Sequence, residues 1–222
     1  MSVLPTVEHE TAAAPTHSII WLHGLGADGH DFEPIVPDLV AAHWPPLRFV
    51  FPHAPVRPVT VNGGVPMRAW YDIKGTAIAD KQDAIGIRES VAAVDALIAR
   101  EGERGVPPQH IVLAGFSQGG AMALAAGLRH PQRLAGIVAL SAYLTLHEQL
   151  AGECSPANAA TPIFQGHGPA DTAVPMALGA LSRDWLRGHG YNVDWHEYPM
   201  GHQVSAAEIA DLRAWLGDRL AA

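Results

Sequence analysis

Short apolar segments alternate with longer amphipathic segments along most of the chain. The short segments are rich in β-branched and aromatic residues and predict strands at 18–23, 48–51, 110–116, 136–141, 162–165 and 193–198. Their apolar residues are continuous, as in strands buried on both faces of a parallel sheet. The longer segments have the apolar spacing of helices, at 83–104, 118–129, 172–189 and 205–220. Strand and helix alternating in this way predict a doubly wound α/β fold with a mostly parallel sheet.

The same pattern predicts the domain organisation. Residues 17–222 fit a single α/β domain, since a chain of 222 residues suits one domain. Residues 1–16, rich in Ala, Thr and Pro, predict a loosely held N-terminal arm. Two irregular stretches, 52–82 and 142–161, interrupt the alternation. Long loops are often functional, so these stretches are where we expect a substrate pocket.

Composition and charge limit the kinds of binding partner and the cellular compartment that we expect for this protein. The net charge is −8, which disfavours a nucleic-acid partner because phosphate binding needs a clustered basic face. Cys154 is the one cysteine, which excludes an intrachain disulfide and predicts an inert thiol. Glu8 and Glu10 lie where a signal peptide would be apolar, and no apolar run approaches the roughly 18 residues of a membrane span. We therefore predict a cytoplasmic protein without stable membrane insertion.

The strongest local motif is Gly-Phe-Ser-Gln-Gly at 115–119. It has the form GxSxG and lies between a predicted buried strand and a predicted helix, where a nucleophile elbow must lie. The tight turn strains the serine backbone and raises its Oγ above the sheet edge, and glycines two residues to either side remove Cβ atoms that would clash. Ser117 is therefore the predicted nucleophile.

A serine nucleophile needs a base and an acid that orients the base, and in this arrangement the acid precedes the histidine in the chain. The aspartates that follow Ser117 are Asp171, Asp184, Asp194, Asp211 and Asp218. Asp171 is the one that directly follows a predicted buried strand, and loops at the carboxyl ends of parallel strands meet at the active face. We predict that Asp171 is the acid; capping the helix expected from Thr172 is its alternative role.

The histidines after Ser117 are His130, His147, His167, His189, His196 and His202. His202 follows the last predicted strand, and Gly201 gives its loop the freedom to place the imidazole. His167 also lies at a strand end, but it precedes Asp171 and so breaks the expected chain order. We predict His202 as the base.

An oxyanion hole should complete the site, formed by two backbone N–H groups that point at the developing negative charge. One is predicted from Gln118, the residue after the nucleophile. The other is predicted from Leu25, between Gly24 and Gly26 in the loop after the first predicted strand.

The segment Gly24–Gly29 also matches GxGxxG, the dinucleotide-binding fingerprint. That fingerprint requires an acid about 20 residues further on, and the next predicted strand ends at Phe51 with no carboxylate after it. Asp28 and Asp31 would also oppose a pyrophosphate, so the sequence disfavours a nucleotide site. No two of the thirteen histidines are four residues apart and no HExxH occurs, so we expect neither a metal nor a cofactor.

With these residues identified, the chain resembles the carboxylesterase and acyl-protein thioesterase family of small, lidless α/β hydrolases. The resemblance runs from about residue 18 to 220, and no counterpart can be given to the arm. Its motifs are WLHGLGADG at 21–29, FPHAP at 51–55, RAWYDI at 68–73, GFSQGGAMAL at 115–124 and MGHQV at 200–204. The resemblance implies a triad of Ser117, Asp171 and His202, an oxyanion hole of Leu25 and Gln118, and a homodimer.

The predicted function is hydrolysis of small-molecule carboxylic esters of short to medium acyl chains, with acyl-protein thioesterase or lysophospholipase activity as the alternative. The triad serves each of these reactions, so the motifs leave the choice open. Apolar residues of the loops are candidates for the acyl pocket, namely Met67, Trp70, Val174 and Met200. A binding protein on a hydrolase scaffold would normally have lost a triad residue, and all three are present.

Overall fold

The computed structural model describes residues 3–75 and 82–220. Residues 76–81 of the irregular stretch, and residues 1–2 and 221–222 at the chain ends, lie outside the described residues.

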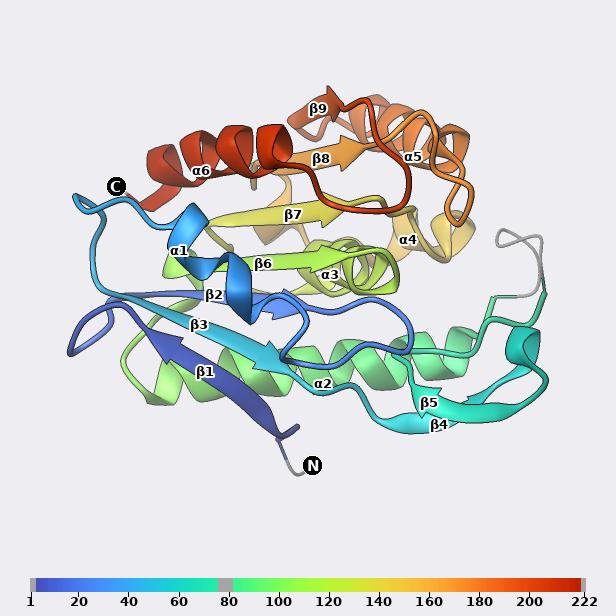
Figure 1. Cartoon of the computed structure of the whole chain (residues 1–222), viewed down its shortest axis with the longest axis horizontal. Helices are drawn as coiled ribbons and strands as arrows, with labels where there is room; N and C mark the ends of the chain where they lie inside the picture. Colours follow the sequence, from blue (N-terminus) through green and yellow to red (C-terminus); the bar gives the residue numbers. More distant parts are fainter. Residues whose placement is uncertain (1–2, 76–81, 221–222) are drawn as a thin grey trace.

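One mixed sheet organises the described chain (Figure 1). Its strands lie in the order β1 (Thr6–Glu10), β3 (Leu47–Pro52), β2 (His17–Leu22), β6 (Ile111–Phe116), β7 (Gly136–Leu140), β8 (Ile163–His167) and β9 (Val193–Glu197). β1 is antiparallel to β3, and the other neighbouring pairs are parallel. The predicted mostly parallel sheet is confirmed.

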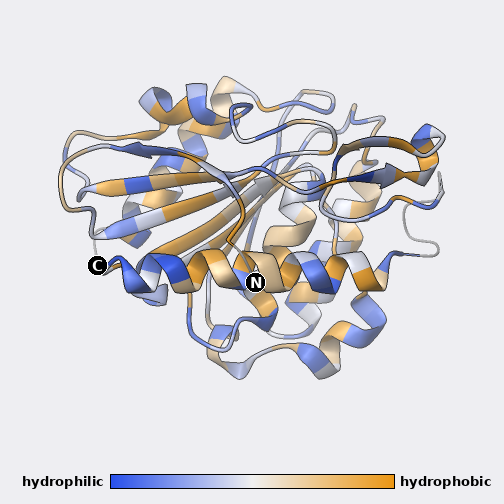
Figure 2. Ribbon diagram, turned by 90° about the horizontal axis from the view of Figure 1, so that it is seen from below, coloured by the Kyte–Doolittle hydropathy of each residue, from blue (hydrophilic) through white to orange (hydrophobic). Residues whose placement is uncertain are grey.

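Helices cover both faces of the sheet. They are α1 (Val36–Leu39), α2 (Ala84–Glu103), α3 (Gln118–Arg129), α4 (His147–Glu153), α5 (Met176–Gly188) and α6 (Ala206–Leu220). Alternate residues of β2 enter two separate cores: Ile19 and Trp21 join the core with α1 and α6, whereas Ile20 and Leu22 join the core with α2 and α3. Figure 1 shows α1 and α6 in front of the sheet with α2 and α3 behind it, and Figure 2 shows apolar residues along the strands between these layers. This arrangement confirms the predicted doubly wound α/β fold.

Each predicted strand and helix corresponds to an observed element, and the largest difference in bounds is at the start of α5. The predicted helix 118–129 has the bounds of α3, whereas the helix predicted from Thr172 begins at Met176. Pro175 lies immediately before α5 and disfavours helical geometry at the residue that precedes it. The residues between Asp171 and Pro175 are thereby left as a loop at the carboxyl end of β8.

The predicted loosely held arm is wrong for Thr6–Glu10, which form the edge strand β1. Its acidic side chains are paired with arginines that are distant in sequence. Glu8 lies 2.8 Å from Arg100 and 2.9 Å from Arg104, and Glu10 lies 2.8 Å from Arg48. The partners lie on α2, directly after α2 and on β3, so periodicity within the arm could not reveal them.

The irregular stretches contain small elements that shape the carboxyl edge of the sheet. The first holds a hairpin of β4 (Val56–Val59) and β5 (Val65–Arg68), and the second holds α4. Short 3₁₀ segments occur at Glu33–Ile35, Thr60–Asn62, Pro108–His110 and Pro156–Asn158. After β5 the chain passes close to the end of β6, which brings residues 70–73 to the candidate site. In the part of the chain that the structure describes, no helix combines the length and the apolar character of a membrane span.

Candidate active site

Ser117 lies in the sharp turn between β6 and α3. Its φ angle is 55° and its ψ angle −121°, a backbone conformation that residues other than glycine rarely adopt. A Cβ on Gly115 would collide with the Gly119 backbone, and a Cβ on Gly119 would collide with the Leu22 carbonyl. The small residues of the motif therefore let the turn close tightly against β2, and the turn holds Ser117 in its strained conformation.

Two hydrogen bonds connect Ser117 to Asp171 through His202. The His202 Nε2 atom lies 2.9 Å from the Ser117 Oγ atom, and its Nδ1 atom lies 2.7 Å from the Asp171 Oδ2 atom. The Asp171 side chain is fully buried, whereas the His202 side chain is 23% exposed. With Nδ1 protonated and donating to the carboxylate, Nε2 is free to accept the serine proton. The structure thus brings together the three residues predicted from chain order.

The Asp171 carboxylate is fixed by its own loop. Its Oδ1 atom accepts hydrogen bonds from the backbone amides of Ala173 at 2.9 Å and Val174 at 2.8 Å, which leaves Oδ2 to His202. The expected alternative role, capping a helix at Thr172, is not observed because α5 begins later. Asp171 instead orders the turn that leads to α5.

The rival histidine, His167, is used in a different way. Its Nε2 atom donates to the Val174 carbonyl at 2.8 Å and lies 3.5 Å from the Asp171 carboxylate. Burial lowers the pKa of His167 below its usual value, which favours the neutral ring. His167 therefore stabilises the loop that carries Asp171 and Val174, and its Nε2 atom is not available to Ser117.

The predicted oxyanion amides belong to two separate segments that meet at the same cavity. Leu25 and Gln118 both line the cavity that contains Ser117 and His202. Among the described residues, neither backbone amide donates a hydrogen bond to another protein group. Both amides are thus available to an oxygen atom of a bound substrate.

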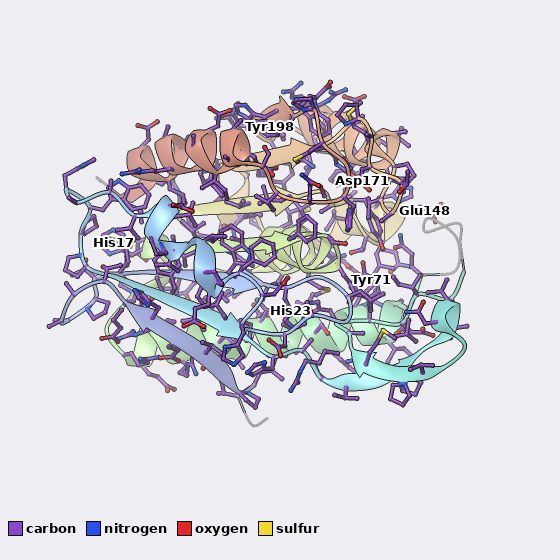
Figure 3. All side chains as sticks on the ribbon, viewed as in Figure 1. His17, His23, Tyr71, Glu148, Asp171 and Tyr198 are labelled. Carbon is purple, nitrogen blue, oxygen red and sulfur yellow. The ribbon has the colours of Figure 1, made fainter. Side chains whose placement is uncertain are left out.

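The cavity has a volume of about 310 Å³ and is largely apolar. Its residues are Gly24, Leu25, Ala27, Asp31, Tyr71, Ile73, Phe116, Ser117, Gln118, Tyr143, Ala173, Val174 and His202. Asp171 and Tyr71 lie beyond the carboxyl ends of the parallel strands, whereas His17 lies at the opposite end of the sheet (Figure 3). The cavity therefore lies at the edge where ligands bind in open α/β sheets.

Of the four residues expected to form an acyl pocket, the structure brings Val174 to the cavity. Met67 lies on the β4–β5 hairpin, where its sulfur is 3.3 Å from the Asn62 amide nitrogen. Trp70 is fully buried in the core, and Met200 is buried with its carbonyl against the Gly168 backbone. These three residues are not part of the cavity lining.

Sequence reasoning missed Tyr71, Ile73 and Tyr143, which form much of the apolar wall. The Tyr71 and Tyr143 phenol oxygens lie 2.7 Å apart. Burial raises the pKa of Tyr71 well above its usual value and that of Tyr143 to about 12. Both phenols therefore stay neutral. All three residues belong to the two irregular stretches that were expected to hold the pocket, but irregular backbone has no period from which side-chain direction could be read.

The glycine-rich segment Gly24–Gly29 does not serve a helix start, as a dinucleotide-binding loop would. It follows β2 as turns that border the cavity, and its Gly26 amide donates to the Arg68 carbonyl at 2.9 Å. Within residues 3–75 and 82–220, no group of three or more His, Cys, Asp or Glu side chains is arranged to hold a metal ion.

Comparisons with known proteins decide the family. The model of the phospholipase/carboxylesterase family matches residues 5–218. The chain belongs to the phospholipase/carboxylesterase family. An acyl-protein thioesterase 1 of Yarrowia lipolytica is 38% identical over 99% of both chains. A probable carboxylesterase of Oryza sativa subsp. japonica is 34% identical over 99% of this chain and 84% of its own length.

Solved structures agree with this membership. Arabidopsis thaliana SOBER1 superimposes with a TM-score of 0.87 at 32% identity, over 92% of this chain and 99% of its own. Zea mays acyl-protein thioesterase 2 superimposes with a TM-score of 0.81 at 28% identity, over 96% of this chain and 99% of its own. The resemblance inferred from the motifs is confirmed. The match of the phospholipase/carboxylesterase family begins at residue 5 and so includes β1, which the sequence comparison by motifs had left without a counterpart. The protein is a carboxylesterase-type serine hydrolase.

Proposed function

We propose that this enzyme hydrolyses carboxylic esters of short to medium acyl chains through an acyl-enzyme on Ser117, without a cofactor. The observation that carries the proposal is the hydrogen-bonded sequence of Ser117, His202 and Asp171 at an apolar cavity. A nucleophile, its base and the acid that orients the base are then within reach of one acyl group.

In the first half-reaction, the Ser117 Oγ atom attacks the acyl carbonyl carbon while His202 Nε2 takes the serine proton. Asp171 stabilises the resulting imidazolium and keeps the ring oriented through Nδ1. The carbonyl oxygen becomes an oxyanion that accepts hydrogen bonds from the backbone amides of Leu25 and Gln118. The C–O or C–S bond then breaks, and the imidazolium donates its proton to the departing alkoxide or thiolate, which leaves as the alcohol or thiol.

In the second half-reaction, water attacks the acyl-enzyme from the side that the leaving group has vacated. His202 takes a proton from this water, the Leu25 and Gln118 amides again hold the oxyanion, and the Ser117 Oγ atom regains its proton as the acid departs. The cycle needs no external oxidant, reductant or metal ion.

The apolar wall of the cavity supports an acyl chain as the bound group. Tyr71, Ile73, Tyr143 and Val174 offer carbon surface beside Ser117, with phenols that stay neutral. Each methylene group that leaves water on binding contributes about 0.8 kcal/mol. Affinity should therefore rise with chain length until the cavity is filled.

A series of p-nitrophenyl esters and matched thioesters, from acetyl to palmitoyl, tests the proposal. We expect kcat/KM to rise from acetyl to a medium chain and then to level off or fall. If the protein reacts with a fluorophosphonate but hydrolyses none of these substrates, the proposed substrate class is wrong. Failure to react with the fluorophosphonate would contradict the activated serine itself.

The names of several relatives favour thioesters as a second substrate class, since they are acyl-protein thioesterases. Comparing an ester and a thioester with the same acyl group would show which leaving group the enzyme prefers. The homodimer and the cytoplasmic location stay predictions, which sedimentation and cell fractionation would test.

A further inference from the structure

Trp70 is fully buried, yet it is hydrogen-bonded to both segments that supply the oxyanion amides. Its indole Nε1–H donates to the His23 carbonyl at 2.9 Å, two residues before Leu25. Its backbone N–H donates to the Gln118 side-chain oxygen at 2.8 Å. One residue therefore spans the distance between the two amides without lining the cavity.

The Gln118 side chain completes the connection on the side of the nucleophile elbow. Its Nε2 atom donates to the Tyr71 carbonyl at 2.8 Å, while its Oε1 atom accepts from Trp70. The two backbone partners fix which end of the amide is oxygen and which is nitrogen. Gln118 is buried, with an exposed fraction of 3% for the whole residue. It thus clamps segment 70–71 onto the first residue of α3.

The Leu25 loop is braced by further bonds from the same neighbourhood. His23 donates through Nδ1 to the Gly24 carbonyl at 2.7 Å and accepts at Nε2 from the Ala54 amide at 3.0 Å. This pairing requires the neutral ring, and burial lowers the pKa of His23 accordingly. The Gly26 amide donates to the Arg68 carbonyl at 2.9 Å, two residues before Trp70.

From this geometry we propose that Trp70 is a positioning residue that holds the Leu25 and Gln118 amides at the separation that an oxyanion requires. The inference rests on the proposed function of these amides as the oxyanion hole. Donors act on a transition state only if they are already in place when its charge develops, because reorganisation would cancel their benefit. Trp70 is not among the residues that line the cavity, so we expect its effect to pass through the two amides.

Trp70→Phe tests the inference because it removes the indole N–H and keeps most of the buried ring. Trp215→Phe is the matched control: Trp215 is 5% exposed on α6, and its indole nitrogen has no hydrogen-bond partner among the described residues. Removing an oxyanion donor outright costs about 10²–10³ in kcat, so misplacing the donors should cost about 10 to 100-fold. We expect this loss in kcat for Trp70→Phe, with KM within about threefold, and no comparable loss for Trp215→Phe.

A second readout separates positioning from a general loss of structure. A trifluoromethyl ketone adds to an activated serine as a tetrahedral oxyanion, so its Ki should rise in Trp70→Phe by the factor by which kcat/KM falls. Rates are normalised to the concentration of serine that reacts with a fluorophosphonate. A raised KM with unchanged kcat would overturn the inference, because it would show that Trp70 acts on substrate binding and not on the oxyanion. Equal losses in the Trp70 and Trp215 variants would also overturn it.

Gln118→Met keeps the backbone amide and removes both side-chain hydrogen bonds, so it serves if Trp70→Phe does not fold. The expected fall in kcat is again about 10 to 100-fold, and wild-type kcat in this variant would overturn the inference. In Trp70→Phe combined with Gln118→Met, the losses should be less than multiplicative because both changes break one connection. A wild-type enzyme without turnover would contradict the proposed function, whereas an active wild type with unaffected variants would contradict the positioning role alone.

Discussion

Two serines end neighbouring parallel strands in nearly the same way. Ser117 follows β6 and Ser141 follows β7, with φ angles of 55° and 47°. The Ser117 amide donates to the Leu140 carbonyl and the Ser141 amide to the Gly166 carbonyl, each at 2.8 Å. The Ser117 Oγ atom lies 2.9 Å from His202, whereas Ser141 is fully buried and its Oγ atom has no partner within the described chain. A strained backbone at the end of a strand is thus common to both serines. Ser117 differs from Ser141 because it has a base within hydrogen-bonding distance and lines a cavity.

The largest expected effect contrasts alanine substitutions at these two serines. Ser117→Ala should lower kcat by roughly 10⁴-fold or more, because triad residues act as a unit. Ser141→Ala removes a hydroxyl that has no hydrogen-bond partner among the described residues, so kcat should stay within about threefold. The measurement is turnover of a medium-chain p-nitrophenyl ester by freshly purified protein. Ester turnover by Ser117→Ala within tenfold of wild type would refute the assignment of the nucleophile.

The second contrast concerns two aspartates, Asp171 in the candidate triad and Asp194 on β9. Asp171→Asn should cost about 10⁴-fold in kcat, because the amide favours the wrong tautomer of His202. Asp194 is 53% exposed and contacts His196 at 3.0 Å, so Asp194→Asn should have little effect. Steady-state kinetics of both variants decides the point. Equal losses would mean that another residue orients the base.

The next prediction concerns how stability depends on pH through Glu208, which like Ser141 is a buried polar group without a hydrogen-bond partner among the described residues. Glu208 on α6 is fully buried, and neither carboxyl oxygen has a partner at hydrogen-bonding distance among the described residues. Burial raises the pKa of Glu208 to about 8 from its usual 4.5, offset in part by the nearby Ser205 backbone amide. The folded protein thus holds this proton more tightly than the unfolded chain. Stability should fall as pH rises from about 4.5 to 8, and the loss should be complete above that range.

Glu208→Gln removes this titration while keeping the shape of the side chain. Between pH 6 and 9 the wild type should lose roughly 1–3 kcal/mol of unfolding free energy relative to the variant, at about 1.4 kcal/mol per pH unit. Urea denaturation at several pH values gives the difference. Parallel pH curves for the two proteins would show that Glu208 does not titrate in this range.

The smallest effect is expected from removing metal ions. A metal bound beside Ser117 would be another explanation of why this serine differs from Ser141. No ligand spacing in the sequence points to such a site, so EDTA should leave kcat/KM unchanged. Activity that disappears with EDTA and returns with zinc would contradict this expectation.

The sequence predicted the candidate triad and the two amides because each lies at a strand end with a local motif. GFSQG encodes a turn, the ends of predicted strands selected Asp171 and His202, and chain order ruled out His167. The fold followed from continuous apolar strands, whose period and length are local properties. These features depend on the immediate neighbours of each residue, and the structure brings the residues together as expected.

The features that escaped prediction depend on contacts between distant segments. The acidic side chains of β1 pair with arginines on β3 and at the end of α2, and no pattern within residues 1–16 predicts these pairs. In RAWYDI, Tyr71 lines the cavity, whereas Trp70 is buried against His23. Which of these two aromatic residues reaches the cavity is decided only by contacts in the folded chain. A side chain in irregular backbone has no periodicity to reveal its direction.

Peptide mapping after fluorophosphonate treatment tests the central claim most directly. The reagent loses fluoride when an activated serine oxygen attacks its phosphorus, and the adduct stays on that oxygen. We expect one phosphonyl group per chain, located by mass spectrometry on Ser117, with none on Ser141 and none in Ser117→Ala. Stoichiometric labelling of any other residue, or an unlabelled protein that still hydrolyses esters, would contradict the assignment of Ser117 as nucleophile.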